Sequence, residues 1–292
     1  MRLRQTCDNF LMLTITDNNA LREQLIEWHQ VGETVALVPT MGNLHKGHMS
    51  LCQLASANAD RVVVSVFVNP TQFGEGEDFG AYPRTPEKDA RQLSRAGIDI
   101  LYAPKAEDIY PLGVENSTRV FVPVLSDALC GEHRTKHFEG VTSVVMRLLN
   151  IVSPNVAVFG EKDFQQFVIL QRMAEELHLH TRILSAPTLR DDAGLAISSR
   201  NQYLTAAETL SAPLLYATLR DARDKLLDGE SIAKVESAAI KTLTNTGFSA
   251  DYFSVRRSSD LSVPKKVAGK LIILVAAELG KARLIDNLQF ET

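Results

Sequence analysis

Two histidines and two glycines lie in a short segment that follows a predicted buried strand. His45 and His48 are three residues apart, so they share one face if a helix begins here. Gly42 and Gly47 allow a ligand to approach the backbone. The N-terminus of a helix offers unpaired N–H groups, which suit a phosphate. The segment therefore predicts a nucleotide site, although histidines at this spacing also occur on surfaces and among metal ligands.

Two more polar clusters could take part in the same chemistry. In Phe159–Gln166, Lys162 could balance phosphate charge, and Asp163 could hold Mg²⁺ or a ribose hydroxyl. A helix start with solvated charges is an equal alternative. The second cluster, Ala196–Asn201, has two hydroxyls and a guanidinium in a row, which could clamp a phosphate. An ordinary polar loop is the alternative there.

Amide side chains follow another apolar run. Asn69 and Gln72 could read a hydroxy acid or an amine by hydrogen bonds. Further along, Arg134, His137 and Phe138 lie in a charged loop, which could form a lid or be solvated. Asn69 and Gln72 thus mark a possible substrate site.

Strands and helices alternate over the first two-thirds of the chain. Val62–Val68 is almost continuously β-branched, which is typical of a strand buried on both faces of a parallel sheet. The alternation predicts a doubly wound, Rossmann-like α/β sheet with ligands at the carboxyl edge of its strands. Strands are expected at 35–38, 62–68, 98–102, 156–159 and 182–184, and helices at 17–30, 47–59, 85–97, 141–152 and 164–177.

The pattern changes after Pro187. Helical periods at 206–227 and 232–246 are followed by apolar strands at 251–255, 271–276 and 282–285. Helices followed by consecutive strands predict a smaller α+β domain. We therefore expect two domains, a Rossmann-like ligand-binding domain over residues 1–186 and a smaller lid domain over residues 187–292.

Composition limits the classes of function. The chain of 292 residues is 45% hydrophobic and carries a net charge of −4, which argues against a dedicated nucleic-acid binder. Its three cysteines are odd in number and widely spaced, so a disulfide framework or zinc knuckle is not expected. The apolar runs are too short for a signal peptide or a membrane span. A cytoplasmic location is expected.

Taken together, the motifs resemble those of the pantothenate synthetase (pantoate–β-alanine ligase) family. The resemblance runs from about residue 33 to residue 287. The segments that carry it are VPTMGNLHKGH, VVVSVFVNPTQF, YPRTPEKD, HFEGV, VFGEKDFQQ, AISSRNQYLT and ARLIDN. The first two alone would indicate only a nucleotidyltransferase with an HxGH signature.

The resemblance implies a reaction and its partners. ATP and (R)-pantoate would give a pantoyl-adenylate and diphosphate, and β-alanine would then give pantothenate and AMP. Family members use Mg²⁺ and commonly form homodimers through the first domain. No partner among nucleic acids or membranes is implied.

The resemblance also implies roles for individual residues. His48 would be a proton donor, His45 and Lys162 would contact phosphate, and these three would be the catalytic residues. Gln72 and Gln166 would hold pantoate, with Gln72 also near β-alanine. The ATP-binding residues would be Met41, Gly42, Asn43, Leu44, His45, Lys46, Gly47, His48, Gly160, Glu161, Lys162, Asp163, Leu189, Ile197, Ser198, Ser199 and Arg200.

The sequence differs from the family's pattern at two positions, and two other functions are possible. Lys46 stands where the family often carries an acid, and Thr71 stands where it often carries Met. Asp89 is a conceivable contributor to a metal site, whose ligands the sequence does not define. The protein could instead be another nucleotidyltransferase of the same superfamily. It could also be a non-catalytic nucleotide-binding protein, which the intact His45, His48 and Lys162 argue against.

Overall fold

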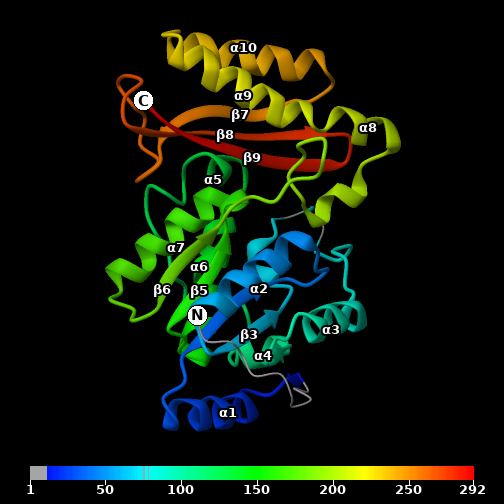
Figure 1. Ribbon diagram of the computed structural model, residues 1–292, viewed down its shortest axis with the longest axis vertical. Helices are drawn as coiled ribbons and strands as arrows, with labels where there is room; N and C mark the ends of the chain where they lie inside the picture. The colour runs from blue at the N-terminus through cyan, green and yellow to red at the C-terminus, as the bar shows by residue number, and fades with distance from the viewer. Residues whose placement is uncertain (1–11, 75, 78) are drawn as a thin grey trace.

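Two sheets of different kinds form the framework of the molecule. The computed structural model describes residues 12–74, 76–77 and 79–292. A six-stranded sheet has the order β1-β4-β3-β2-β5-β6, and a three-stranded sheet has the order β7-β8-β9. Figure 1 shows the small sheet with α9 and α10 at one end of the molecule, and the large sheet with its helices at the other.

All the strand pairs of the large sheet are parallel, as the alternation of strands and helices predicts. The order of the strands reverses beside β2, which pairs with both β3 and β5. Ligands of such sheets bind where the order reverses. The strands are β1 (Leu13–Ile15), β2 (Val35–Thr40), β3 (Arg61–Val66), β4 (Ile100–Tyr102), β5 (Val156–Gly160) and β6 (Arg182–Ala186).

Helices cover both faces of this sheet. In β2, Val35 and Leu37 belong to one apolar cluster with residues of α1, α6 and α7, while Ala36 and Val38 belong to another with residues of α2 and α3. The helices are α1 (Asn18–Gln30), α2 (Lys46–Asn58), α3 (Pro86–Arg95), α4 (Ala106–Ile109), α5 (Cys130–His133), α6 (His137–Val152) and α7 (Phe164–Glu176).

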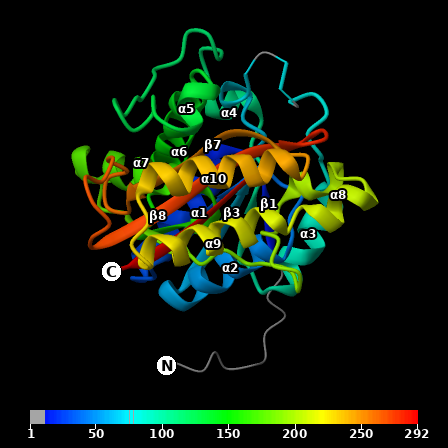
Figure 2. The ribbon, with the colours of Figure 1, turned by 90° about the horizontal axis from the view of Figure 1, so that it is seen from above.

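The rest of the chain builds the small sheet and its helices. Figure 2 shows α9 and α10 lying together across the strands β7 and β8. The sheet's other face brings Ile272 and Leu274 into the cluster that also holds α6 and α7. The elements are α8 (Ala206–Ser211), α9 (Leu214–Leu227), α10 (Ile232–Asn245), β7 (Ser249–Arg257), β8 (Lys270–Leu279) and β9 (Ala282–Glu291).

Several predicted bounds are wrong for physical reasons. The helix expected over 206–227 is interrupted before Pro213, which cannot donate a helical hydrogen bond. The strands β7 to β9 extend beyond their predicted apolar runs, because pairing with the neighbouring strand continues through polar residues at their ends. The short strand β1 has no strong apolar signal and was not predicted. The two-domain division at residue 186, where β6 ends, stays a prediction.

Three further points concern the ends of elements and the chain. Thr85 occupies the position before α3, as expected, but its hydroxyl donates to the Asp89 carboxylate instead of capping the backbone. Cys7 lies outside the described residues. Within the part that the structure describes, the helices lack the length and apolarity needed to cross a membrane.

Candidate active site

The histidine segment is a tight turn between β2 and α2. Gly42 has φ +81°, a conformation that side chains other than glycine rarely adopt. A Cβ atom there would lie 3.0 Å from Val66 Cγ1 and 3.2 Å from Asp89 Oδ2. Glycine is therefore required here to bring the chain close to β3 and α3.

Asp89 anchors this turn from α3. Its buried carboxylate accepts hydrogen bonds from the backbone N–H of Asn43 (2.9 Å) and of Leu44 (2.8 Å), and from Thr85 Oγ1 (2.9 Å). Such bonds to an ionised acceptor are stronger than neutral ones. The contacts satisfy the buried carboxylate, and they show that Asp89 holds the histidine turn in place.

His45 and His48 stack against each other at the start of α2. Their ring centroids are 4.0 Å apart, and the backbone N–H of His45 donates to His48 Nδ1 at 3.3 Å. Because a backbone N–H can only donate, His48 carries its proton on Nε2 when it is neutral. His45 Nδ1 is buried and finds no hydrogen-bond partner among the described residues.

Both imidazoles are held in the neutral form. Burial, followed by the charges of His45 and Lys162, lowers the pKa of His48 to about 3. Burial, followed by the Lys162 charge, lowers the pKa of His45 to about 4. At neutral pH His48 can therefore donate a hydrogen bond from Nε2, but it is not an imidazolium acid in the unliganded protein.

The lysine segment lies at the end of the neighbouring strand β5. Its residues 161–163 form the 3₁₀ turn η2 (Glu161–Asp163) ahead of α7. Lys162 Nζ lies 3.7 Å from Asp163 Oδ2, and Glu161 Oε1 accepts from Ser185 Oγ at 2.8 Å. The small sheet also holds this turn, because Asn287 Nδ2 donates to the carbonyls of Glu161 (2.8 Å) and Lys162 (3.1 Å).

The serine–arginine segment is brought against the histidine turn. Ser198 precedes the 3₁₀ turn η3 (Ser199–Tyr203), and its hydroxyl accepts from the Arg200 N–H at 3.2 Å. Ser199 Oγ donates to the carbonyl of Asn43 at 3.4 Å. Ile197 N–H donates to the carbonyl of Leu189 at 2.9 Å, which ties two predicted ATP-binding residues together.

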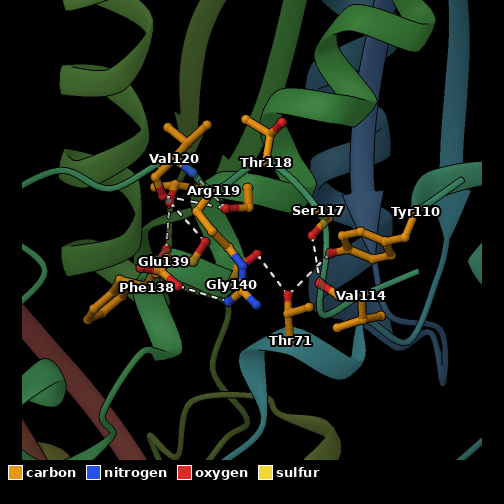
Figure 3. A network of polar contacts seen from close by, with 12 residues as sticks. Thr71, Tyr110, Val114, Ser117, Thr118, Arg119, Val120, Phe138, Glu139 and Gly140 are labelled. Atoms are coloured by element: carbon orange, nitrogen blue, oxygen red, sulfur yellow. Dashed lines mark hydrogen bonds and ion pairs between the residues drawn. The ribbon is translucent and has the colours of Figure 1, made fainter. Parts of the chain in front are cut away.

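Gln72 ends the short 3₁₀ turn η1 (Pro70–Gln72), which follows β3. Figure 3 shows α6 packed against this turn, with Thr71 between Gly140 and Tyr110. A Cβ atom on Gly140 would lie 2.2 Å from the Thr71 carbonyl oxygen and 2.7 Å from the Gln72 nitrogen. Only glycine allows this close contact, which places Gln72 beside the helix.

Arg134, His137 and Phe138 are not solvated. Arg134 forms a two-pronged ion pair with Glu77 (2.7 and 2.6 Å), and Phe138 is buried. His137 Nδ1 donates to the Gln72 carbonyl at 2.7 Å, so its Nε2 accepts from Arg134 Nη1 at 2.9 Å. Burial, followed by the Arg134 charge, lowers the pKa of His137 to about 3, which keeps this arrangement neutral.

One cavity collects most of the predicted site residues. It has a volume of about 240 Å³ and shares Arg134, His137, Lys162 and Arg200 with an adjoining cavity of about 480 Å³ that reaches the small sheet. Volumes of several hundred Å³ are typical of small-molecule sites. The predicted residues that line the first cavity are Met41, His45, Gly47, His48, Asn69, Gln72, Gly160, Lys162, Asp163, Gln166, Leu189, Ile197, Ser198, Ser199 and Arg200.

Five predicted ATP-binding residues do not line the cavity: Gly42, Asn43, Leu44, Lys46 and Glu161. Leu44 is buried, and Lys46 is exposed. Gly42 and Asn43 shape the histidine turn. Their predicted contact with ATP stays a prediction. Arg134 and His137 are lining residues for which the sequence indicates no definite role.

The fold and the site define a Rossmann-like α/β protein of the nucleotidyltransferase type, with histidine, lysine and serine–arginine segments around one cavity. The model of the pantoate–β-alanine ligase family matches residues 13–289. The chain belongs to this family.

Relatives with full-length similarity support that assignment. The chain is 52% identical over 279 residues to the pantothenate synthetase of Xylella fastidiosa strain 9a5c, covering 95% of this chain and 99% of the relative. It is 51% identical over 269 residues to the pantothenate synthetase of Alcanivorax borkumensis, covering 92% and 94%.

Solved structures agree with the fold. A pantothenate synthetase from Thermus thermophilus matches with a TM-score of 0.90 at 40% identity, covering 96% of this chain and 100% of that one. The pantoate–β-alanine ligase of Francisella tularensis, solved with β,γ-ATP and β-alanine, matches with a TM-score of 0.81 at 32% identity, covering 95% and 97%. The predicted fold class and family are confirmed.

Proposed function

We propose that this chain joins (R)-pantoate to β-alanine, with cleavage of ATP to AMP and diphosphate, through a pantoyl-adenylate. The observation that carries the proposal is the convergence of His45, His48, Lys162 and Gln72 on one cavity. Family membership supports it, as does the relative from Francisella tularensis, which was solved with an ATP species and β-alanine.

In the first step, a carboxylate oxygen of pantoate attacks the α-phosphorus of ATP. A new O–P bond forms, the bond from the α-phosphorus to the bridging oxygen breaks, and diphosphate leaves. Negative charge accumulates on phosphate oxygens, so donors aimed at them accelerate the step. His48 would donate through Nε2–H, and Lys162 would contribute a positive charge. Ser198, Ser199 and Arg200 would close over the phosphates.

In the second step, the neutral amine of β-alanine attacks the acyl carbon of the adenylate. A C–N bond forms, the bond from the acyl carbon to the AMP oxygen breaks, and the nitrogen loses a proton. Gln72 and Gln166 would hold pantoate in place, and Gln72 would lie near the amine. The backbone around Leu189 would receive the adenine. Positioning of the two reactants can supply a large part of the rate in a step of this kind.

We further propose that Mg²⁺ enters with ATP as part of the substrate. Among residues 12–74, 76–77 and 79–292, there is no group of three or more His, Cys, Asp or Glu side chains arranged to hold a metal ion. Mg²⁺ commonly binds through substrate phosphates, water and one or two carboxylates. Asp163, beside Lys162 and lining the cavity, is the carboxylate that fits this role.

The proposal also includes three predictions from the sequence. These are a homodimer, a cytoplasmic location and a smaller domain that acts as a lid. Three large apolar side chains of one segment are exposed, as expected of a contact surface: Leu112 (74%), Phe121 (46%) and Val124 (78%). Light scattering of the wild type and of Phe121→Asp tests the dimer. A monomeric wild type would contradict it.

Isotope transfer tests the adenylate. Pantoate carrying ¹⁸O in both carboxylate oxygens is incubated with ATP, β-alanine, Mg²⁺ and the protein. Mass spectrometry is expected to find one ¹⁸O in AMP and one in pantothenate. AMP without ¹⁸O, formed together with pantothenate, would exclude a pantoyl-adenylate.

A further inference from the structure

The side-chain amide of Asn69 has only one possible orientation. The backbone N–H of Thr71 donates to Asn69 Oδ1 at 3.4 Å, and Asn69 Nδ2 donates to the Gly140 carbonyl at 3.2 Å. A backbone N–H can only donate, and a carbonyl can only accept, so the oxygen and nitrogen ends of the amide are identified. Asn69 is almost completely buried, at 1% exposure. It belongs to the wall of the cavity, and both ends of its amide are bonded to other groups of the protein.

Tyr110 strengthens this orientation. Its hydroxyl donates to Asn69 Oδ1 at 2.6 Å and lies 3.2 Å from Thr71 Oγ1 (Figure 3 shows the second contact). Burial raises the pKa of Tyr110, so the hydroxyl stays protonated and remains a donor. Its ring lies 4.8 Å below the Arg147 guanidinium, a contact that does not involve the hydroxyl.

The orientation of Asn69 determines that of Gln72. The second hydrogen of Asn69 Nδ2 goes to Gln72 Oε1 at 3.1 Å, so Gln72 Nε2 is on the side of Met41, 3.2 Å from its sulfur. A thioether is a weak acceptor, which a substrate oxygen can replace. Met41 and Gln72 both line the cavity.

We propose that Tyr110 is a positioning residue that acts through Asn69 to fix Gln72 as a hydrogen-bond donor toward an oxygen of the acid substrate. This rests on the proposed function, because the acid is taken to be pantoate. The Gln72 side of the cavity then selects a carboxylate or hydroxyl oxygen. The Gln72 side does not favour a group that can only donate hydrogen bonds.

The variant Tyr110→Phe removes the hydroxyl and keeps the ring. The loss of one neutral hydrogen bond corresponds to roughly a fivefold change in an equilibrium constant. We expect the KM for pantoate to rise about three- to tenfold in ATP–diphosphate exchange, with the KM for ATP within about twofold of the wild type. The matched control is Tyr102→Phe, which removes a buried hydroxyl of β4 that donates to Asn18 of α1. It is expected to leave both KM values unchanged.

A second variant reverses the polarity of the amide. In Asn69→Asp, both oxygens accept, so Gln72 turns its N–H groups toward residue 69 and its carbonyl toward the cavity. The KM for pantoate is expected to rise more than in Tyr110→Phe. Wild-type kinetics in both variants, or an equal rise in the KM values for ATP and pantoate, would overturn the proposal.

A wild type without pantoate-dependent exchange would count against the proposed function and not against the positioning role. The orientation is then read directly from ¹⁵N spectra of the Gln72 side-chain amide. Tyr110→Phe is expected to shift this resonance, while Tyr102→Phe leaves it in place. An unshifted resonance in Tyr110→Phe would overturn the positioning role by itself.

Discussion

The side-chain amide of Asn287, near the end of the chain, donates to the backbone carbonyl of Lys162 at 3.1 Å. The same amide also holds the carbonyl of Glu161, and its neighbour Asp286 forms a two-pronged ion pair with Arg190 (2.6 and 2.8 Å). The Arg190 guanidinium lies 3.5 Å from the ring centroid of Tyr216. The small sheet and its helices thus hold the turn that carries Lys162, at the end of strand β5 of the large sheet.

Removing this support is expected to affect turnover more than binding of the acid. Asn287→Ala leaves the backbone carbonyls of Glu161 and Lys162 without this donor, and the Lys162 turn loses its fixed position. We expect kcat to fall about tenfold or more, with the KM for pantoate changed less than about threefold. Steady-state kinetics check this. The control Gln289→Ala changes an exposed residue of the same strand. Equal activity of the two variants would contradict the role of Asn287.

The Asp89 contacts predict a different pattern. Asp89→Asn keeps the size of the side chain but replaces one accepting oxygen by a donor, facing backbone N–H groups. The histidine turn should loosen, with a loss of about 1–3 kcal/mol in the free energy of unfolding and a higher KM for ATP. Urea unfolding and kinetics measure the two effects. Glu87→Gln removes an exposed charge from the same helix and serves as the control. Unchanged stability in Asp89→Asn would show that the anchor is unimportant.

The neutral histidine pair makes a prediction about rate. His48→Ala removes the Nε2–H donor, so kcat should fall about 10²–10³-fold, while the KM for ATP changes little. Because the pKa of His48 is about 3 in the free protein, kcat/KM of the wild type should show no inflection near pH 6.5 from this residue. A raised KM for ATP with intact kcat would assign His48 to binding alone.

The same lowered pKa values predict how stability depends on pH. The pKa values of His45, His48 and His137 fall from 6.5 to about 4, 3 and 3 on folding. Between those values and pH 6.5 the unfolded chain binds more protons, so folding is favoured above pH 6.5 and weakens as the pH falls. Each histidine contributes a slope of up to about 1.4 kcal/mol per pH unit.

Urea unfolding between pH 7 and pH 5 measures this slope. His137→Gln should reduce the slope of the free energy of unfolding against pH by the contribution of one histidine. The reason is that one buried group that binds a proton only in the unfolded chain is lost. His178→Gln, at an exposed position, should leave the slope unchanged. A stability that does not vary from pH 7 to pH 5 would mean that these histidines are protonated in the folded protein.

The large sheet and the main site segments could be predicted because their signals are local. A β-branched run such as Val62–Val68 predicts a buried strand, and the turn after it must lie at the sheet's carboxyl edge. The role of Asp89 could not be predicted in this way. It depends on a contact with Asn43 and Leu44, more than 40 residues away in sequence.

Dependence on contacts between residues distant in sequence also explains why the roles of Asn287, Tyr110 and Asn69 could not be predicted. Asn287 lies about 125 residues from the turn it supports, and Tyr110 acts on Asn69 from a separate loop. From the sequence alone, Asn69 could equally have bound a substrate directly or supported another residue. Only its burial and its bonds to Thr71 and Gly140 show that its amide is used within the protein. Hydrogen-bond polarity of this kind requires coordinates.

The most direct test of the account is exchange of labelled diphosphate into ATP by the purified protein with Mg²⁺, in the absence of β-alanine. Formation of a pantoyl-adenylate predicts exchange that requires (R)-pantoate, saturates with it and is lost in His48→Ala. Exchange without pantoate, or none with pantoate while pantothenate is still formed when β-alanine is added, would contradict it.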